Sequence, residues 1–333
     1  MRVLVTGGGG FLGRHVVTQL LEAGHAVRSL ARGHYPELEA AGAESVRGDL
    51  ADAARPWAGA LHGVDAVVHC AAKAGVFGPR EDFFRANVLG TRALLEEARR
   101  AGVRRFVHTS SPSVCFDGGD HRMAGPDLPL ATRFLSPYPE SKAQAEREVL
   151  AASGRDGLVC VALRPHLIIG PGDPHLLPRL VTRARAGRLV RVGDGRNEVS
   201  LTSVVNAAAA HVAAVESLGP ASPAAGRAYF VGQREPVLLW SWIGELLAAL
   251  DLPPIRRHLS LKSAYALGAG LETIWKVLRR PGDPPMTRFV ALQLATSHSY
   301  DMTALEHDLG YRERVDLAAA TRAAIEDLRA RGV

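Results

Sequence analysis

A tyrosine and a lysine four residues apart carry the most suggestive chemistry in this sequence. Tyr138 and Lys142 stand in the string Tyr-Pro-Glu-Ser-Lys, which opens a helix-like segment reaching Ala151. Residues four apart share one side of a helix. A lysine ammonium beside a phenol favours the phenolate, which lowers the tyrosine pKa from its ordinary value of about 10. Such a tyrosine can exchange a proton with a carbonyl or an alcohol while hydride moves to or from a nicotinamide.

A cluster of hydroxyl side chains supplies a second polar group. It comprises Thr109, Ser110, Ser111 and Ser113 and ends the apolar run that begins at Phe106. Ligands of open α/β sheets bind beyond the carboxyl ends of the strands. The cluster is therefore predicted to lie at a ligand-binding edge of a sheet.

A spaced glycine cluster near the N-terminus indicates what that ligand would be. An apolar run leads into Gly7, Gly10 and Gly13, and a segment apolar at helical spacing follows up to Gly24. Gly7 would permit a tight strand-to-helix turn, Gly10 would let backbone amides approach a pyrophosphate, and Gly13 would allow close helix packing. A helix N-terminus favours the negative charge of a diphosphate. The pattern predicts a dinucleotide site.

The elements that would position these groups alternate along the chain. Short β-branched runs alternate with helix-like segments, which predicts an α/β fold with a Rossmann-type, doubly wound parallel sheet. Residues 1–165 are expected to form the nucleotide-binding domain, to which 197–218 return. Residues 166–196 and 219–333 are expected to form a smaller, mostly helical substrate-binding region. The expected strands are 3–6, 26–30, 65–71, 105–109 and 158–163.

Composition excludes several classes of function. The chain has 333 residues, 47% of them hydrophobic, and a formal net charge of +6. Its arginines are scattered, without the basic blocks of nucleic-acid-binding proteins, so no nucleic-acid partner is predicted. The histidines and the three cysteines lack metal-ligand spacing, so neither a metal nor a disulfide is expected. Met1 leads directly into the first strand, which predicts a cytoplasmic protein without a signal peptide.

One segment, 261–280, has two interpretations. It is amphipathic to apolar with basic flanks, and Glu272 and Lys276 within it argue against a transmembrane helix. It could form a lid over an apolar substrate pocket. Alternatively it could lie on a membrane surface as a peripheral contact and collect a lipidic substrate.

Glycine cluster, hydroxyl cluster and Tyr-x-x-x-Lys, in this order, resemble the extended short-chain dehydrogenase/reductase superfamily over nearly the whole chain. Within it, the sequence is similar to the 3β-hydroxysteroid dehydrogenase/isomerase-like branch. More narrowly, it resembles the bacterial 2-alkyl-3-oxoalkanoate reductases of long-chain olefin and lipid β-lactone biosynthesis. The strings that carry this narrower resemblance are 72–75, 85–91, 111–114, 164–173 and 175–180.

The resemblance implies roles for particular residues. Ser111 would orient the substrate carbonyl, Tyr138 would be the acid, and Lys142 would bind the nicotinamide ribose and tune Tyr138. Ser110 is the alternative serine, one position earlier. Asn87 matches an asparagine of a helix that faces the site, with a structural or relay role.

The cofactor choice depends on the end of the second strand. Ala31 and Arg32 stand where an NAD-preferring fold places an acidic residue, and an arginine can accept a 2′-phosphate, so NADP(H) is predicted, with NAD as the alternative. Arg32 could equally be a surface residue, and Asp49 a helix cap. Predicted cofactor contacts are Gly7, Gly10, Phe11, Leu12, Arg32, Asp49, Leu50, Ala71, Ala72, Lys73, Tyr138, Lys142, Pro165 and His166.

The predicted reaction is the NADPH-dependent reduction of the 3-keto group of a 2-alkyl-3-oxoalkanoic acid. Lys73, Arg179 and Arg196 are candidates for holding the substrate carboxylate, since a buried anion must be paired. Alternatives are an NAD-dependent 3β-hydroxysteroid-type alcohol dehydrogenase, a nucleotide-sugar epimerase or dehydratase, and a silent cofactor sensor. The resemblance further implies a homodimer that associates with condensing or β-lactone-forming enzymes.

Overall fold

The main sheet of the molecule is parallel throughout. In the computed structural model, which describes residues 1–332, seven strands pair in the order β12-β7-β5-β4-β1-β2-β3. The order reverses between β1 and β4, which is the switch point where α/β sheets bind ligands. The strands are β1 (Arg2–Thr6), β2 (Ala26–Ala31), β3 (Glu44–Arg47), β4 (Ala66–His69), β5 (Arg105–Thr109), β7 (Val159–Pro165) and β12 (Ala228–Val231).

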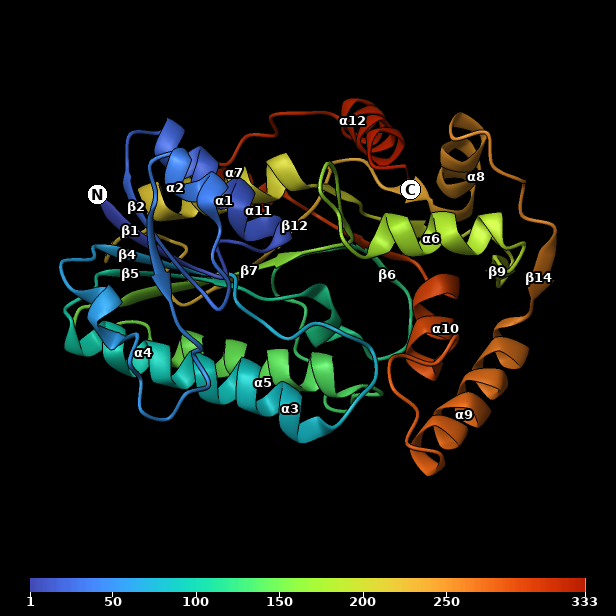
Figure 1. Ribbon diagram of the computed structural model, residues 1–333, viewed down its shortest axis with the longest axis horizontal. Coiled ribbons are helices and arrows are strands. Elements are labelled where there is room, and N and C mark those ends of the chain that lie inside the picture. The colour runs from blue at the N-terminus through green and yellow to red at the C-terminus, as the bar shows by residue number, and fades with distance from the viewer. Residues whose placement is uncertain (333) are drawn as a thin grey trace.

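Helices cover both faces of this sheet, which confirms the predicted fold class (Figure 1). Every residue of β4 and β7 is buried, as expected of strands with helices on either side. One face carries α1 (Phe11–Glu22), α2 (Pro36–Ala40), α7 (Val204–Ser217) and α11 (Thr303–Leu309). The other carries α3 (Arg80–Phe84), α4 (Gly90–Arg100) and α5 (Pro137–Ala152), with the π-helical turn η2 (Arg85–Leu89) between α3 and α4. Two 3₁₀ turns are η1 (Ala58–Leu61) and η3 (Pro112–Cys115).

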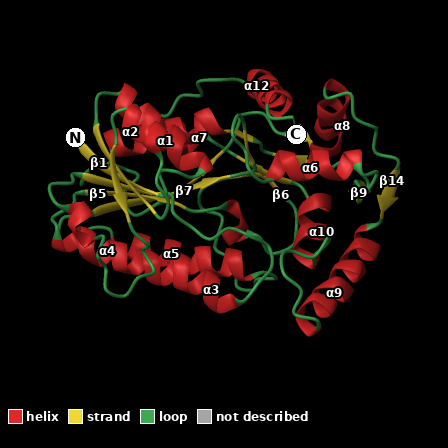
Figure 2. Ribbon diagram, viewed as in Figure 1, coloured by secondary structure: helices red, strands yellow, loops and turns green. Residues whose placement is uncertain are grey.

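A second, distal region lies beyond the carboxyl ends of the main strands (Figure 2). It contains a four-stranded sheet in the order β13-β10-β15-β6 and two short strand pairs, β11 with β8 and β14 with β9. Its strands are β6 (His121–Ala124), β8 (Ile168–Ile169), β9 (Val190–Val192), β10 (Glu198–Val199), β11 (Thr202–Ser203), β13 (Val237–Leu238), β14 (Arg257–Leu259) and β15 (His298–Tyr300). Its helices are α6 (Leu176–Arg185), α8 (Leu239–Ala249), α9 (Leu261–Val277), α10 (Arg288–Ala295) and α12 (Leu317–Ala330).

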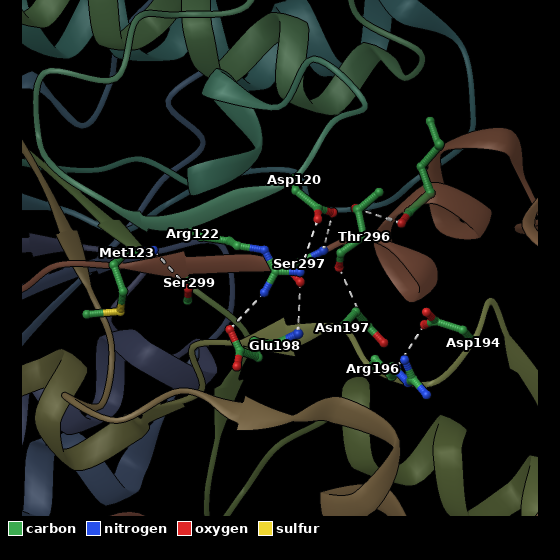
Figure 3. Close-up of polar contacts among 11 residues, drawn as sticks. Asp120, Arg122, Met123, Asp194, Arg196, Asn197, Glu198, Thr296, Ser297 and Ser299 are labelled. Carbon is green, nitrogen blue, oxygen red and sulfur yellow. Dashed lines mark hydrogen bonds and ion pairs between the residues drawn. The ribbon is translucent and has the colours of Figure 1, made fainter.

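Polar contacts between distant segments hold the second sheet together (Figure 3). The Asp120 carboxylate accepts a hydrogen bond from the Ser297 amide at 2.8 Å. Arg122 pairs with Glu198 at 3.0 Å, and the Ser297 hydroxyl accepts the Glu198 amide at 3.0 Å. These bonds join β6, β10 and the start of β15, whose residues are up to 179 positions apart. The distal region is therefore assembled by long-range pairing.

The division between the two regions differs from the prediction at five elements. β6 falls within 1–165, and β10 and β11 fall within 197–218, yet all three belong to the small sheets of the distal region. β12 and α11 fall within 219–333, yet β12 is the edge strand of the main sheet and α11 packs against β12 and α7. The cause is hydrophobic, because all four residues of β12 are buried and pair with β7. α7, which falls within 197–218, packs on α1 and against β5. Within residues 1–332, no helix is long and apolar enough to cross a membrane.

Candidate active site

The glycine turn after β1 brings three backbone segments into close contact. Gly7 has a positive φ of 71°, and a Cβ there would fall 2.9 Å from the Ala71 backbone. A Cβ on Gly13 would fall 2.1 Å from the Gly7 carbonyl oxygen. Side chains at these positions would clash with the neighbouring backbone, so packing requires glycine at both. The loop that begins at Ala71 therefore lies directly against the turn.

The start of α1 fits the phosphates of a dinucleotide. Gly10 is its N-cap and contributes no side-chain cap, and the helix begins at Phe11 and Leu12. The first N–H groups of a helix lack partners within it and, together with the helix dipole, favour an anion. Because the glycines leave room for close approach, a pyrophosphate can reach these amides.

The end of β2 has a cationic side chain and no carboxylate. Ala31, Arg32 and Gly33 follow one another there, and the Arg32 side chain is exposed. The Tyr35 ring lies over the glycine turn, since a Cβ on Gly9 would fall 2.1 Å from it. Arg32 is thus available to a 2′-phosphate, and nothing acidic at this strand end would grip a 2′-hydroxyl.

Two predicted adenosine contacts have local partners. The Asp49 carboxylate accepts the Ala51 amide at 2.9 Å, which is a turn-stabilising bond. Leu50 is buried and packs beneath Gly90, whose Cβ would fall 3.3 Å from the Leu50 Cβ. Both residues therefore have structural roles that do not depend on a cofactor.

Ser111 and Tyr138 meet at the carboxyl end of β5. Ser111 is the N-cap of η3, and its hydroxyl lies 2.9 Å from that of Ser113. Tyr138 lies in the first turn of α5, because Pro137 begins that helix, and its phenol interacts with the Ser111 side chain. Ser110 points elsewhere, with its hydroxyl buried and without a partner among the described residues. Of the two candidate serines, Ser111 is the one beside the phenol.

Lys142 lies one helical turn further along α5 and points beneath β5. Its Nζ donates to the Thr109 carbonyl at 2.5 Å and lies 3.3 Å from Nε2 of His108. Burial lowers the pKa of Lys142 to about 8, and the nearby Glu146 carboxylate opposes that shift.

The phenol of Tyr138 has a raised pKa. Burial is the larger cause, and the hydrogen bond with Ser111 opposes it. The expected lowering of the Tyr138 pKa by Lys142 is absent, because the ammonium is directed at the backbone of β5 and at His108. At neutral pH the structure holds a protonated phenol.

Asn87 fixes the loop that follows β4. It lies in the middle of the π-helical turn η2. Its Oδ1 accepts the Lys73 amide at 2.7 Å, and its Nδ2 donates to the Lys73 carbonyl at 3.0 Å and to the Ser141 hydroxyl at 2.9 Å. Asn87 thus ties the 71–73 loop to the helix of Tyr138 and Lys142.

A buried ion pair anchors the same helix and was not anticipated from the sequence. Arg164 on β7 donates two hydrogen bonds to Glu146, at 2.6 and 3.0 Å, and their side chains are 4% and 0% exposed. Glu146 follows Lys142 by four residues, and this spacing is the sequence signal that would place it on the same helix face. The pair secures α5 to the sheet beneath the site.

The remaining predicted residues lie around the site with other partners. His166 directly follows Pro165, is buried, and has its Nδ1 2.5 Å from the Ser200 carbonyl oxygen. Among the carboxylate candidates, Lys73 pairs with Asp82 at 3.0 Å and Arg179 with Asp283 at 3.2 Å. Arg196 is exposed on the turn before β10 (Figure 3). The structure does not bring these three cations together.

Comparisons with known proteins identify the family and support the fold. Residues 4–262 match the model of the 3-beta hydroxysteroid dehydrogenase/isomerase family. A dTDP-glucose 4,6-dehydratase from Streptomyces venezuelae with NAD bound is 28% identical, with a TM-score of 0.76 over 100% of this chain and 98% of that one. The fold and site define an NAD(P)-dependent oxidoreductase of the extended short-chain dehydrogenase/reductase type.

Within that class the relatives are more specific. The chain belongs to the 3-beta hydroxysteroid dehydrogenase/isomerase family. It is 45% identical to a 2-alkyl-3-oxoalkanoate reductase from Stenotrophomonas maltophilia, over 97% of this chain and 98% of the relative. It is 42% identical to a 2-alkyl-3-oxoalkanoate reductase from Shewanella oneidensis, over 94% and 82% of the two chains.

Proposed function

We propose that the protein reduces the 3-keto group of a 2-alkyl-3-oxoalkanoic acid to the 3-hydroxy acid, with NADPH as the reductant. The observation that carries this proposal is the near full-length similarity to reductases of that name, at 45% and 42% identity. The paired Ser111 and Tyr138 at the end of β5 supply the chemistry that a ketone reduction needs.

The two hydroxyls act on the substrate oxygen. As the carbonyl carbon is reduced, negative charge develops on its oxygen, and a positioned donor stabilises that charge. Ser111 donates a hydrogen bond to the oxygen, and Tyr138 delivers a proton to it. The raised pKa of Tyr138 suits this direction, because the phenol retains its proton at neutral pH until the oxygen can take it.

Lys142 and Asn87 position the reacting groups. The Lys142 ammonium lies below the site and, with a pKa of about 8, stays mostly charged at neutral pH. It would hold the nicotinamide ribose. Asn87 holds the 71–73 loop in place against α5 through its hydrogen bonds to Lys73 and Ser141.

Arg32 favours NADPH over NADH. The exposed guanidinium at the end of β2 can pair with a 2′-phosphate, whereas a carboxylate would have repelled it. When bound, the dinucleotide supplies the hydride. Protein residues supply binding, orientation and the proton.

A second candidate, oxidation of a 3β-hydroxysteroid with NAD, is favoured by the description of the matched family. The deciding experiment follows absorbance of the reduced cofactor with purified protein. A racemic 2-alkyl-3-oxo acid with NADPH should turn over faster than with NADH. Because β-keto acids lose carbon dioxide spontaneously, oxidation of the 3-hydroxy acid with NADP⁺ is the matched control. Turnover of a 3β-hydroxysteroid or a nucleotide-sugar, with none of either lipid acid, would refute the proposal.

A further inference from the structure

Helix α9 exposes an apolar stripe. Nine large hydrophobic side chains are exposed among the described residues, and four of them are Leu267, Ile274, Val277 and Leu278. The spacing of 267, 274 and 278 by seven and four residues puts them on one side of the helix. Val277 is 74% exposed. Such a concentration on a single helix and its C-cap, Leu278, differs from the scattered apolar residues of an ordinary surface.

The opposite face of α9 is firmly packed, so the stripe is held outward by the fold. A Cβ on Gly268 would fall 2.5 Å from the Thr287 backbone, which shows how closely α9 approaches the chain entering α10. Glu272 is buried and accepts the Arg288 amide at 2.7 Å and its Nε at 2.9 Å. α9 and α10 therefore form one rigid pair.

Basic side chains adjoin the C-terminal end of the stripe. Lys276, Arg279 and Arg280 are exposed, and the Arg280 guanidinium lies 5.1 Å from the Trp275 ring centre. Glu272 is the one acidic residue of α9, and it faces inward. An exposed apolar stripe on a helix with cations and no exposed anion is complementary to a bilayer surface that carries anionic headgroups.

The position of α9 connects this surface with the substrate side of the site. α9 projects at the end of the molecule away from the N-terminus (Figure 1). Phe289 of α10 packs edge-on against Phe116, with ring centres 5.9 Å apart. Phe116 directly follows η3, whose N-cap is Ser111.

We propose that α9 docks flat on an anionic lipid bilayer, with Leu267, Ile274, Val277 and Leu278 in the interface and the basic side chains at the headgroups. Length and polarity rule out a spanning helix in the described residues. A second protein is the weaker fit, because four partly exposed aliphatic side chains fall well short of the roughly 800 Å² per partner that a stable protein interface buries.

Cosedimentation of the full-length protein with extruded vesicles tests this proposal without any turnover. We expect binding to vesicles that contain phosphatidylglycerol, weaker binding to phosphatidylcholine alone, and loss of the difference in high salt because salt screens headgroup charge. The double variant Ile274→Asp/Val277→Asp should bind anionic vesicles more weakly by a factor of about ten or more. Arg279→Glu/Arg280→Glu should bind phosphatidylcholine unchanged and lose the preference for anionic lipid.

The matched control is Leu238→Asp, which changes an equally exposed leucine on β13, 44% exposed against 47% for Leu267. It should bind vesicles like the wild type, and circular dichroism should show all variants folded. Wild-type protein that stays in the supernatant, or equal binding by the α9 variants, would overturn the proposal. So would a concentration-dependent dimer in sedimentation velocity that is lost in the Asp variants while lipid binding is unchanged, because the stripe would then be a protein interface.

Discussion

The nucleotide-binding half and the distal region are built in contrasting ways. In the first, neighbouring strands such as β1 and β2 or β4 and β5 follow each other in the chain. Gly7 and Ser111 lie within a few residues of a strand end, whereas Tyr138 lies in the first turn of α5. In the second, four strands from widely separated segments meet in one sheet. The difference teaches that the nucleotide-binding half is built largely from local strand–turn–helix units, whereas the distal region depends on long-range pairing.

Replacing Tyr138 with Phe should produce the largest effect and leave the distal region untouched. We expect kcat to fall by about 10²–10⁴-fold, because the proton donor is lost, while the cofactor dissociation constant stays within about twofold. Stopped-flow turnover and cofactor fluorescence titration measure the two quantities. Tyr265→Phe on α9 is the control and should keep wild-type kcat. Full activity of the Tyr138→Phe variant would remove the phenol from the mechanism.

Arg164→Met should cost stability between β7 and α5 of the nucleotide-binding half. It leaves Glu146 buried without its partner, and breaking a buried ion pair in this way typically costs about 3–5 kcal/mol. The matched control is Arg92→Met, which breaks the exposed pair with Glu148 and should cost less than about 1 kcal/mol. Urea unfolding measures both. Similar losses in the two variants would show that Glu146 finds compensation elsewhere.

Acid should destabilise the two halves to a similar degree. Burial lowers the pKa of His69 and His166 to about 3, and of His211 and His298 to about 4. Their unfolded pKa is about 6.5, so below that value the unfolded chain binds protons that the native state refuses. The free energy of unfolding should fall by about 1.4 kcal/mol per pH unit for each histidine, down to about pH 4.

Chemical denaturation between about pH 7 and about pH 5 measures that slope. His298→Gln should reduce the slope by the contribution of one histidine, about 1.4 kcal/mol per pH unit. A slope unchanged in this variant would contradict the assignment of His298 as a buried neutral residue.

The smallest expected effect concerns the cofactor alone. Arg32→Ala should lower the preference for NADPH over NADH by about tenfold, because one charge-assisted contact to a 2′-phosphate is lost. The ratio of kcat/KM for the two cofactors measures the preference. Arg99→Ala, at a surface ion pair on α4, should leave the ratio unchanged. An unaltered ratio in the Arg32→Ala variant would show that the guanidinium does not contact the cofactor.

Sequence reasoning reached the parts of the molecule that depend on local rules. Gly7 and Gly13 could be predicted because their roles follow from backbone geometry within one turn. Tyr138 and Lys142 were predicted at the start of a helix, which is where α5 holds them, and the strand at 105–109 was predicted with its observed bounds. These features require no knowledge of distant partners.

Other features were beyond sequence reasoning because their partners are distant. Nothing near Arg164 in the chain signals that Glu146 neutralises it. The pairing of β12 with β7 depends on residues about 66 positions apart. The direction of Lys142, toward His108 and away from the phenol, is set by how α5 sits on β5 and was not apparent from spacing.

The π-helical turn at 85–89 has an evolutionary consequence. A π turn holds one residue more than an α-helical turn, and such turns are frequent at functional sites. Removing a residue there would restore regular helical bonding but rotate everything before it by about 100° around the axis. The amide of Asn87 would then swing off the Lys73 backbone. A lineage that deleted the extra residue would have a regular α-helix at this point but would lose the hydrogen bonds between Asn87 and the Lys73 backbone.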